Sequence, residues 1–447
     1  MLEDIRKTRL EKLENLKKAG INPYPADVLR THTNAEALDA FKRITNKKIT
    51  LVGRVRSIRE HGGSTFAHIE DGSTLLTTSG SAEIQIYLKK DAVGDKQYKL
   101  FLENIDLGDF IQVSGKLFLT KKGEKTLLVA EWKILAKSLL PLPSEWYGLE
   151  DVEERFRKRY LDLVLNKEIR DKFVKRSEII TNIRKFLDES GFLEVETPML
   201  QIMAGGAKAK PFKTHLNALG MDLYLRIAPE LYLKRLLVGG FEKVYELGRN
   251  FRNEGMDREH NPEFTMLEFY AAYWDYNKMM EFTEKLLKSL DKKVFKGKFK
   301  KVEYSKIVGN KEEKEVFGKT TEPTFVINHP VEISPLAKKL DGSTPAERGN
   351  VARFQLIVNG LEIANGFSEI NDPIDQAERF KAQEIERKKG NEEAHQFDKD
   401  FIEALEYGMP PAAGIGIGID RLAVLLTNSK TLREAMLFPT MKPKENE

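Results

Sequence analysis

The residues best suited to chemistry lie between Val244 and Tyr273, where charged and aromatic side chains alternate with apolar ones. This stretch reads as two apolar strands joined by a charged loop, Asn253 to Pro262, which ends in an Asn-Pro turn signal. Alternate residues of a strand share a face. The pattern therefore predicts one surface that carries the side chains of Asn250, Arg252, Glu254, Phe264, Met266, Glu268 and Tyr270.

A cation, an aromatic ring and carboxylates on one surface suit a ligand that carries a phosphate, a flat ring and a cationic group. Guanidinium binds phosphate oxygens in a fork, and a partly buried carboxylate requires a positive partner. An ordinary hairpin with a solvated charged turn would explain this run if it stood alone. Runs of the same kind recur further along the chain, which favours the ligand site.

Three stretches, in order along the chain, resemble the signature motifs of the class II lysyl-tRNA synthetases. FLDESGFLEVETPML, from Phe186 to Leu200, resembles the first motif, FRNEGMDREHNPEFTMLEFY the second, and GIGIGIDRLAVLLT the third. The likeness covers almost the whole chain. It implies an enzyme that activates L-lysine with ATP to form lysyl-adenylate, and then transfers lysine to the 3′ end of tRNA(Lys).

The resemblance assigns the ATP-binding residues by their positions in these motifs. Arg252 matches the arginine that binds the α-phosphate of ATP. Arg421, in the first turn of a helix, is suited to bind the polyphosphate of ATP. These two are the expected catalytic residues, because the reaction needs positioning and charge stabilisation but no protein nucleophile. Glu254 and Phe264 match family residues that lie near the adenine of ATP, and His260 matches a family residue near its terminal phosphates.

The resemblance also assigns a pocket for the amino acid. Glu230 matches the partner of the α-amino group, although an acidic residue near a helix start is favourable without any ligand. Glu268, Tyr270 and Glu369 match the groups that receive the ε-ammonium, which is costly to bury without charge-matched partners. The remaining pocket positions are Gly206, Asn365 and Phe367.

A magnesium site is expected on a hairpin near residue 360. Val-Asn-Gly-Leu is a two-residue hairpin signal that pairs Ile357 with Glu362 and Gln355 with Ala364. In the family, the positions of Gln355 and Glu362 are usually both glutamates that hold Mg²⁺ against ATP. An amide oxygen still ligates a hard cation, but one negative charge is lost. We therefore expect saturation at a higher Mg²⁺ concentration than in relatives.

Three alternating glycines precede the helix of the third motif. Gly414, Gly416 and Gly418 leave one face of a predicted strand bare, so that a purine could lie flat on it. Their spacing is not that of a dinucleotide-binding fingerprint. A tight glycine strand followed by a surface arginine is the alternative interpretation.

The elements that position these groups divide into four parts. Residues 1–46 are an N-terminal helical segment, in which 2–19 predict an amphipathic helix that ends at Gly20. Five short β-rich segments between glycine-rich turns in 47–140 favour an OB-fold barrel. Residues 141–163 suit a linker. The resemblance implies that 164–447 form an antiparallel sheet flanked by helices, so the fold class is α+β.

The predicted barrel suits single-stranded nucleic acid. Such barrels stack bases on aromatic side chains beside a basic groove, and Phe66 has several basic neighbours, although a core aromatic is its alternative role. The resemblance adds Gln85 and Glu131 as partners for anticodon bases. The loop 72–82 is longer than the family usually has and would expose Leu75 and Leu76.

Composition limits the classes of protein that remain. The 447 residues include 73 basic and 69 acidic side chains, so any affinity for nucleic acid must come from local patches. Without cysteine there is no disulfide, thiol nucleophile or cysteine zinc site. No apolar run approaches the ~20 residues of a membrane span. We expect a soluble, cytoplasmic homodimer formed through the first motif, with no membrane partner.

Several readings stay open from sequence alone. An aspartyl- or asparaginyl-type synthetase shares the architecture, but it would need a cation where Glu268 and Glu369 stand. A paralogue that modifies a protein or makes signalling nucleotides commonly lacks the N-terminal barrel. An RNA-binding protein with an inactive catalytic domain is the reading that Gln355 favours most. The lysine-rich segment 285–320 is short for the family and leaves acceptor-stem contacts open.

Overall fold

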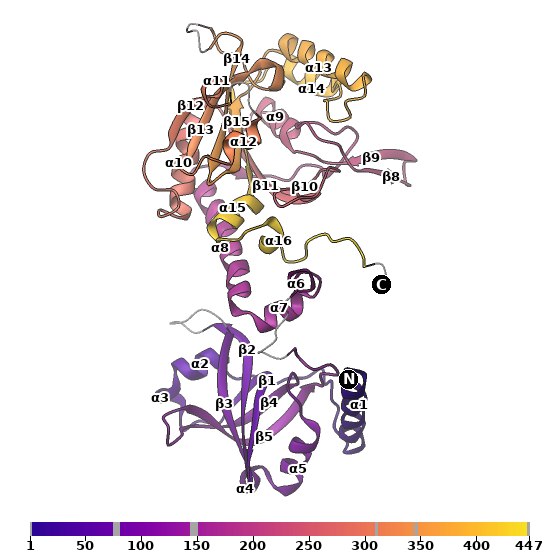
Figure 1. Ribbon diagram of the computed structural model, residues 1–447, viewed down its shortest axis with the longest axis vertical. Coiled ribbons are helices and arrows are strands. Elements are labelled where there is room, and N and C mark those ends of the chain that lie inside the picture. The colour runs from indigo at the N-terminus through magenta and orange to yellow at the C-terminus, as the bar shows by residue number, and fades with distance from the viewer. Residues whose placement is uncertain are drawn as a thin grey trace. The chain divides into compact units, whose positions relative to one another are not determined.

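The computed structural model describes residues 2–74, 81–143, 151–308, 312–342, 344 and 347–444. The chain forms two compact units, Met1–Asp171 and Lys172–Glu447 (Figure 1). Leu75 and Leu76, which the sequence placed in an exposed loop, lie outside the described residues. No helix in the described ranges is long and apolar enough to cross a membrane.

Five strands of the N-terminal unit close into a barrel, which confirms the predicted OB-fold. The strands follow the spatial order β1-β2-β3-β5-β4, and β3 and β5 pair in parallel. Alternate apolar residues such as Leu51, Ile84 and Val129 fill the interior without solvent exposure. The bounds are β1 (Ile49–His61), β2 (Ser64–Thr74), β3 (Ser81–Lys89), β4 (Phe110–Leu119) and β5 (Lys125–Ala136).

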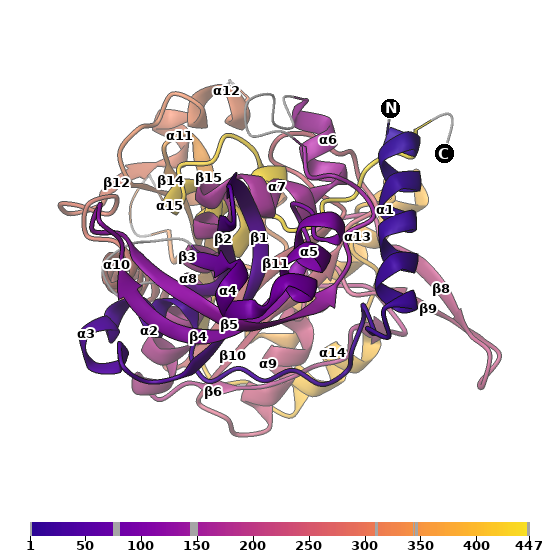
Figure 2. The ribbon, with the colours of Figure 1, turned by 90° about the horizontal axis from the view of Figure 1, so that it is seen from below.

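Short helices cover the barrel, and the N-terminal helix packs on it as well. Figure 2 shows α1 (Leu2–Lys18) alongside the barrel strands, where it contacts α5 (Asp95–Asn104). It buries Leu13 and Leu16, and it ends before Gly20 as predicted, because the φ of Gly20 is +78°. The other helices are α2 (Asn34–Asp39), α3 (Phe41–Ile44) and α4 (Lys90–Val93).

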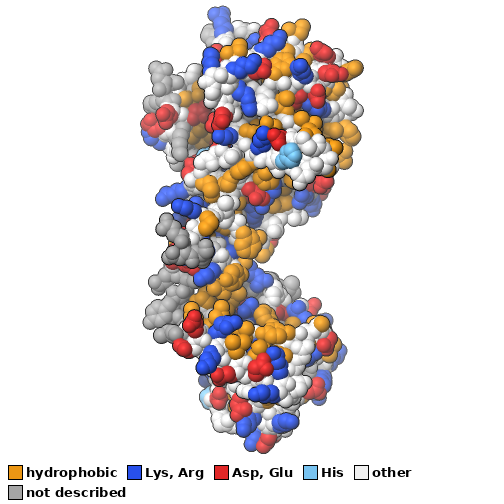
Figure 3. All heavy atoms as spheres, turned by 90° about the vertical axis from the view of Figure 1, so that its right-hand side faces the viewer, with side chains coloured by type: hydrophobic (Ala, Val, Ile, Leu, Met, Phe, Trp, Pro, Cys, Tyr) orange, Lys and Arg blue, Asp and Glu red, His pale blue; other side chains and the backbone are white. Residues whose placement is uncertain are grey.

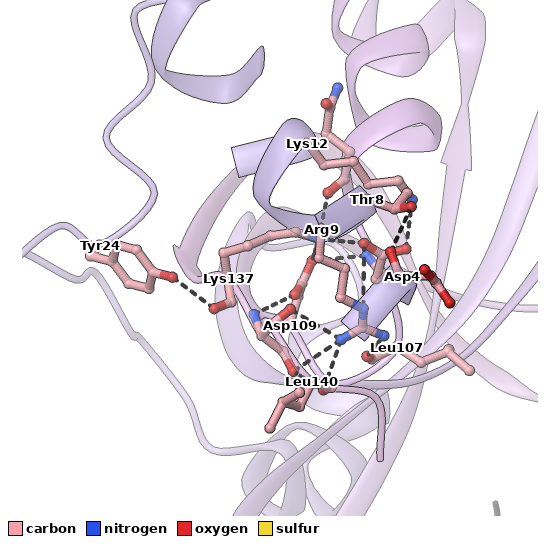
Figure 4. A network of polar contacts seen from close by, with 12 residues as sticks. Asp4, Thr8, Arg9, Lys12, Tyr24, Leu107, Asp109, Lys137 and Leu140 are labelled. Carbon is pink, nitrogen blue, oxygen red and sulfur yellow. Dashed lines mark hydrogen bonds and ion pairs between the residues drawn. The ribbon is translucent and has the colours of Figure 1, made fainter. Parts of the chain in front are cut away.

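A polar network anchors α1 to the barrel (Figure 4). The buried Arg9 donates from Nη1 to the carbonyl oxygen of Leu140 and from Nη2 to that of Leu107, each at 3.0 Å. The Lys137 Nζ atom, which is fully buried, lies 2.7 Å from Asp109 Oδ2. Helix α1 is therefore packed against the barrel unit.

The second half of the predicted linker is helical. It contains α6 (Val152–Arg157) and α7 (Arg159–Leu165), which separate at Lys158, and the long helix α8 (Lys167–Glu189) follows. An ion pair between Arg159 and Asp162, both buried, links consecutive turns at 2.6 Å between Nη1 and Oδ2.

An eight-stranded sheet forms the centre of the C-terminal unit, in the order β12-β13-β14-β15-β16-β11-β10-β6. Its inner pairs are antiparallel as predicted, but the outermost pair at each edge is parallel, so the sheet is mixed. Parallel neighbours need a crossover connection, and both edge pairs are joined by segments that contain helices. The bounds are β6 (Leu193–Glu194), β10 (Lys243–Phe251), β11 (Glu263–Ala272), β12 (Lys300–Glu303), β13 (Thr324–Pro330), β14 (Asn350–Val358), β15 (Leu361–Ser368) and β16 (Ala412–Gly418).

Helices pack on both faces of this sheet (Figure 1). On one face, α8, α10 (Tyr276–Leu290) and α15 (Ile419–Leu426) bury Ile183, Met279 and Leu422 against the sheet. On the other, α9 (Glu230–Val238), α13 (Pro373–Lys388) and α14 (Lys399–Glu406) form a second core. The remaining elements are β7 (Leu200–Gln201), β8 (Lys213–Leu216), β9 (Met221–Leu225), α11 (Tyr304–Ile307), α12 (Glu313–Phe317), η1 (Val331–Ile333) and α16 (Leu432–Ala435).

Strand pairing places the predicted site residues in one row across the sheet. Strands β10 and β11 form the predicted hairpin, in which Asn250 faces Phe264. Glu268 faces Gly416 on β16, Gly416 faces Asn365 on β15, and Asn365 faces Gln355 on β14. Leu267 and Phe269, at the alternate positions of β11, lie in the core with α8 and α10. The prediction of a shared face from strand periodicity is confirmed.

The hairpin between β14 and β15 corrects one predicted register. Asn359 and Gly360 have φ values of +48° and +80°, which suit the predicted two-residue turn, and Ile357 faces Glu362 as expected. Gln355, however, faces Asn365 and not Ala364. A β-bulge between Leu356 and Ile357 sets two residues of one strand against one of the other, and this shifts every later pair by one position.

Charge is dispersed over the face of each unit that Figure 3 shows. On the face shown in Figure 3, basic and acidic side chains are intermixed over each unit. This agrees with the near balance of 73 basic and 69 acidic residues, and it leaves nucleic-acid affinity to local patches.

Candidate active site

Two cavities with a common wall lie on the sheet face that carries the predicted residues. The inner chamber, about 310 Å³, is lined by Glu230, Glu268, Tyr270 and Phe367 among others. The outer chamber, about 280 Å³, is lined by Glu254, His260, Phe264 and Arg421 among others. Five residues line both chambers and therefore form the common wall: Arg252, Met266, Glu362, Asn365 and Gly416.

The residues predicted to bind ATP and those predicted to bind lysine line different chambers, apart from those in the common wall. Every residue expected to bind ATP lines the outer chamber, and every residue expected to bind lysine lines the inner one except Glu369. Glu369 lies just behind that wall, since a Cβ atom added to the lining residue Gly414 would stand 2.4 Å from its Oε1 atom. The tertiary structure therefore brings together residues from segments more than a hundred positions apart.

Three buried carboxylates lie in or directly behind the wall of the inner chamber, which Lys208, Arg252 and Arg353 also line. Glu230, Glu268 and Glu369 are all buried, and the Tyr270 hydroxyl donates to Glu268 Oε2 at 3.0 Å. Burial raises the pKa of Glu268 to about 8, and the charge of Glu230 adds to the rise. Burial also raises the pKa of Glu230. Buried carboxylates of this kind suit a positively charged group, since a cation restores the ionised state that burial opposes.

The glycines of β16 differ in how closely other atoms approach them. A Cβ atom at Gly414 would lie 2.2 Å from Tyr270 Cε1, so this glycine makes room for the Tyr270 ring and for Glu369. At Gly416 the nearest atom would be Met266 Sδ at 3.5 Å, which is ordinary contact. Gly416 and Gly418 line the outer chamber. The bare face predicted for a purine is therefore limited to these last two glycines.

Arginines and an aromatic ring define the outer chamber. The Arg252 guanidinium lies 5.0 Å from the centre of the Phe264 ring, and no acceptor for its Nε atom exists among the described residues. Arg421 donates to the carbonyl oxygen of Glu362 at 2.9 Å and to His260 Nε2 at 3.2 Å. His260 in turn donates from Nδ1 to Asp257 Oδ1 at 2.9 Å. Donors and a ring of this kind suit a nucleotide.

The predicted metal ligands can hold a magnesium ion only if phosphates supply part of its coordination shell. Glu362 lies in the common wall, and its carboxylate has no partner among the described residues. Gln355 is buried, and its Oε1 atom accepts a hydrogen bond from His329 Nε2 at 2.7 Å. The described ranges hold no cluster of three or more His, Cys, Asp or Glu able to bind a metal. Mg²⁺ commonly needs only one or two carboxylates when phosphates and water complete its shell, so the residues fit in that mode.

Two cations of this site escaped the sequence analysis. Arg353 lines the inner chamber and donates from Nε to Asn365 Oδ1 at 3.0 Å. It lies two residues before Gln355 on β14, so strand periodicity was the signal that would have found it. Lys234 is fully buried next to Glu230 and Glu369. The sequence shows it only as a lysine four residues after Glu230 on a helix.

The barrel carries the residues predicted to bind the anticodon, but not as one cluster. The Phe66 ring is half-buried and stacks on Tyr87, with 4.4 Å between ring centres. Gln85 lies on the neighbouring strand and donates to Glu124 Oε2 at 2.8 Å. Glu131 is exposed and pairs instead with Lys48 at 2.8 Å. Tyr87 and Glu124 are thus surface neighbours of Phe66 and Gln85 that the sequence analysis did not name.

Comparisons with known proteins agree with this geometry. Residues 151–442 match the family described as tRNA synthetases class II (D, K and N), and residues 49–135 match the OB-fold nucleic acid binding domain. A lysine–tRNA ligase of Carboxydothermus hydrogenoformans is 48% identical over 99% of this chain and 99% of its own length. This chain belongs to the lysine–tRNA ligase family. Members from Pelotomaculum thermopropionicum and Halalkalibacterium halodurans are 48% and 45% identical and are covered over 96% and 98% of their length.

This chain is shorter than its relatives in places, so its alignment with a family member contains gaps in the sequence of this chain. The alignment with the Carboxydothermus ligase has 496 positions, whereas this chain has 447 residues, so that relative carries segments that this chain lacks. This agrees with a shortened segment between α10 and β13, where the structure has only β12, α11 and α12 as regular elements in the described part.

Proposed function

We propose that this chain activates L-lysine with ATP and then transfers lysine to tRNA(Lys). The inner chamber carries this proposal, because its buried carboxylates select an amino acid with a cationic side chain. Aspartate and asparagine, which related members of the class take, offer no cation for Glu268. The relatives named above are lysine–tRNA ligases, which supports the same substrate.

The common wall is where the two substrates meet. With ATP in the outer chamber and lysine in the inner one, the lysine carboxylate and the α-phosphate both approach Arg252, which lines both chambers. The carboxylate oxygen attacks the α-phosphorus in line and pyrophosphate leaves. Arg252 and Arg421 stabilise the charge that develops on the phosphate oxygens. Glu254 and Phe264 hold the adenine, and His260 orients Arg421 toward the terminal phosphates.

Magnesium is the cofactor that the family generally requires. When bound, it supplies positive charge to the phosphate oxygens. Glu362 would hold it as the one carboxylate of the common wall, and the Gln355 amide oxygen would be a weak second ligand.

In the second step, the lysyl group is transferred from the adenylate to tRNA. The 3′-terminal adenosine hydroxyl attacks the lysyl carbonyl carbon and AMP leaves. None of the described chamber residues stands out as a general base for this step. We further propose that Phe66, Gln85 and Glu131 read the anticodon, and that the protein works in the cytoplasm, where tRNA is charged.

We propose a homodimer through the first motif. Strand β6 lies at the edge of the large sheet, and the segment around it exposes Leu193, Met199, Leu200 and Ile202. An exposed apolar group of this kind at a sheet edge suits burial against a second copy related by a two-fold axis.

Lysine-dependent exchange between ATP and pyrophosphate tests the proposed function. We expect exchange with lysine and none above background with aspartate, asparagine or arginine. Exchange with aspartate or asparagine would mean that the pocket has been assigned to the wrong amino acid. No exchange with any amino acid at high Mg²⁺ would contradict catalysis and favour an RNA-binding protein.

Lysine binding should strengthen as the pH rises through about 8. Below this pH Glu268 is protonated in the empty chamber, because burial and the charge of Glu230 raise its pKa to about 8, and the ammonium group needs the carboxylate. The KM for lysine should fall by up to about tenfold per pH unit below that value and then level off. Exchange rates at saturating ATP measure this, and a flat profile between about pH 6 and 8 would contradict it.

Gln355→Glu should lower the Mg²⁺ concentration needed for exchange. The variant restores a second carboxylate next to Glu362, so we expect the midpoint of a Mg²⁺ titration to fall by roughly threefold to tenfold. Gln112→Glu, on the barrel strand β4, is a control with the same change in charge and no expected effect. An unchanged midpoint in Gln355→Glu would show that position 355 does not contact the ion.

Phe66→Ala should weaken tRNA charging without affecting amino-acid activation. Loss of one stacking ring costs about 1–3 kcal/mol per base, which corresponds to a KM for tRNA(Lys) raised roughly 5- to 150-fold. Pyrophosphate exchange without tRNA should stay at the wild-type rate. Equal losses in both assays would indicate a folding defect, and no loss in charging would contradict the anticodon role.

A further inference from the structure

Lys234 is a charged residue that the mechanism above does not use. Its side chain is fully buried, and it lines neither chamber. Its Nζ atom lies 2.5 Å from Glu230 Oε1 and 2.5 Å from Glu369 Oε2. The rings of Phe367 and Phe401 lie 5.3 and 5.9 Å from the same atom.

Lys234 contacts one oxygen of the Glu230 carboxylate and one of the Glu369 carboxylate, which leaves the other oxygen of each for a ligand. The other oxygen of Glu369, Oε1, is buried without a hydrogen-bond partner among the described residues and points to the Gly414 side of the chamber. Glu230 itself lines the chamber. Because one nitrogen holds both carboxylates, the two oxygens left for a ligand are also held in a fixed relation.

Lys234 offsets one of the three carboxylate charges around the amino-acid pocket. Glu230, Glu268 and Glu369 together carry three negative charges when ionised. Lys208, Arg252 and Arg353 also line the chamber, but among the described cations only Lys234 forms an ion pair with any of these three carboxylates. Lysine brings two ammonium groups into the chamber, while its carboxylate faces Arg252. Without Lys234, a third carboxylate would stay buried without a partner, which is strongly unfavourable, and it would take up a proton instead.

We infer that Lys234 is a positioning residue that sets the charge of the lysine pocket, so that the pocket accepts an amino acid with two ammonium groups. This inference rests on the proposed function. Burial acts to lower the pKa of Lys234, but the charges of Glu230 and Glu369 raise it above the ordinary value, so the residue is charged at every working pH. The other titratable groups near this cluster are Glu268 and Tyr270 on β11, Arg353 on β14, and His395 between α13 and α14.

Lys234→Met tests the inference with a neutral side chain of similar length. We expect the KM for lysine to rise roughly 100-fold or more, while the KM for ATP changes less than about threefold. The pH at which lysine binds best should move upward by about one unit, because an unpartnered carboxylate then holds a proton near neutrality. Discrimination against 2-aminohexanoic acid, which is lysine without the ε-amino group, should fall by a similar factor.

A double variant separates charge from packing. Lys234→Met with Glu369→Gln removes one positive and one negative charge, so the pH profile should return toward that of the wild type although the KM for lysine stays raised. Melting temperatures and ATP binding identify variants that do not fold. A double variant that folds where Lys234→Met does not, and that shows the wild-type pH profile, supports the charge balance.

Three results would overturn the inference. They are a normal KM and pH profile for lysine in Lys234→Met, a double variant whose pH profile remains displaced, and loss of folding in both variants, which would mean that Lys234 serves only the fold. Failure of the proposed function is distinguishable from all three, because the wild-type chain would then show no lysine-dependent exchange.

Discussion

Arg252→Met should lower the rate of lysine-dependent pyrophosphate exchange roughly 100- to 1,000-fold, the usual cost of removing one preorganised charge donor from a transition state. Arg252 lines both chambers, so its guanidinium lies where the lysine carboxylate and the α-phosphate meet. No described residue accepts a hydrogen bond from its Nε atom, which leaves this donor for a substrate. Methionine keeps contact with the Phe264 ring, so the loss should appear mainly in kcat.

A nearby arginine provides the control for this experiment. Arg249 is three residues away on β10, but it pairs on the surface with Glu263 at 3.5 Å. Arg249→Met should leave exchange within about twofold of the wild type, because exposed ion pairs contribute little. If Arg252→Met raised the KM for ATP while kcat stayed constant, Arg252 would bind the ground state and would not be a catalytic residue.

Glu268→Gln should raise the KM for lysine roughly 100- to 1,000-fold and change the KM for ATP by less than about threefold. The amide has the shape of the carboxylate and can still accept the hydrogen bond that Tyr270 donates at 3.0 Å, so packing is conserved. It cannot balance a buried ammonium group, and breaking a buried charge pair costs about 3–5 kcal/mol. Pyrophosphate exchange over a range of lysine concentrations measures this effect.

The pH profile adds a second readout to the same variant. Burial raises the pKa of both Glu268 and Glu369 to about 8, but Glu369 pairs with Lys234, whereas Glu268 has no ion-pair partner among the described residues. Glu268→Gln should therefore also remove most of the improvement in lysine binding between about pH 6 and 8. Glu263→Gln, at the exposed start of β11, is the control and should match the wild type. A Glu268→Gln enzyme that keeps its pH dependence would assign that dependence to Glu230 or Glu369.

Strand periodicity was the most reliable guide to the site. Alternation along the hairpin of β10 and β11 was enough to predict that Arg252, Phe264 and Glu268 share one face, because successive side chains of a strand must point to opposite sides. The Asn-Gly turn at 359–360 was readable for the same local reason. The β-bulge beside it was not, since no residue type marks where a ladder gains an extra residue.

Long-range contacts add information that the sequence could not supply for several predicted residues. Gln355 is expected as a magnesium ligand, and a hydrogen bond from the distant His329 occupies one lone pair of its amide oxygen. Gly414 was expected to leave space for a purine, but Tyr270 and Glu369 fill that space. Glu131 is expected to bind an anticodon base, and in the structure it pairs with Lys48 on the barrel surface.

The sequence by itself determined the family, the order of the two units, the strand faces and the residue types of the two chambers, because these depend on local periodicity and on motifs that are contiguous in the chain. Only the tertiary structure decided which charges meet. Lys234 and Glu369 are separated by more than a hundred residues, and the packing of α9 against the sheet brings the ammonium group to 2.5 Å from the carboxylate. In a dry interior a charge is stable only beside its opposite, so the pocket's net charge depends on this packing.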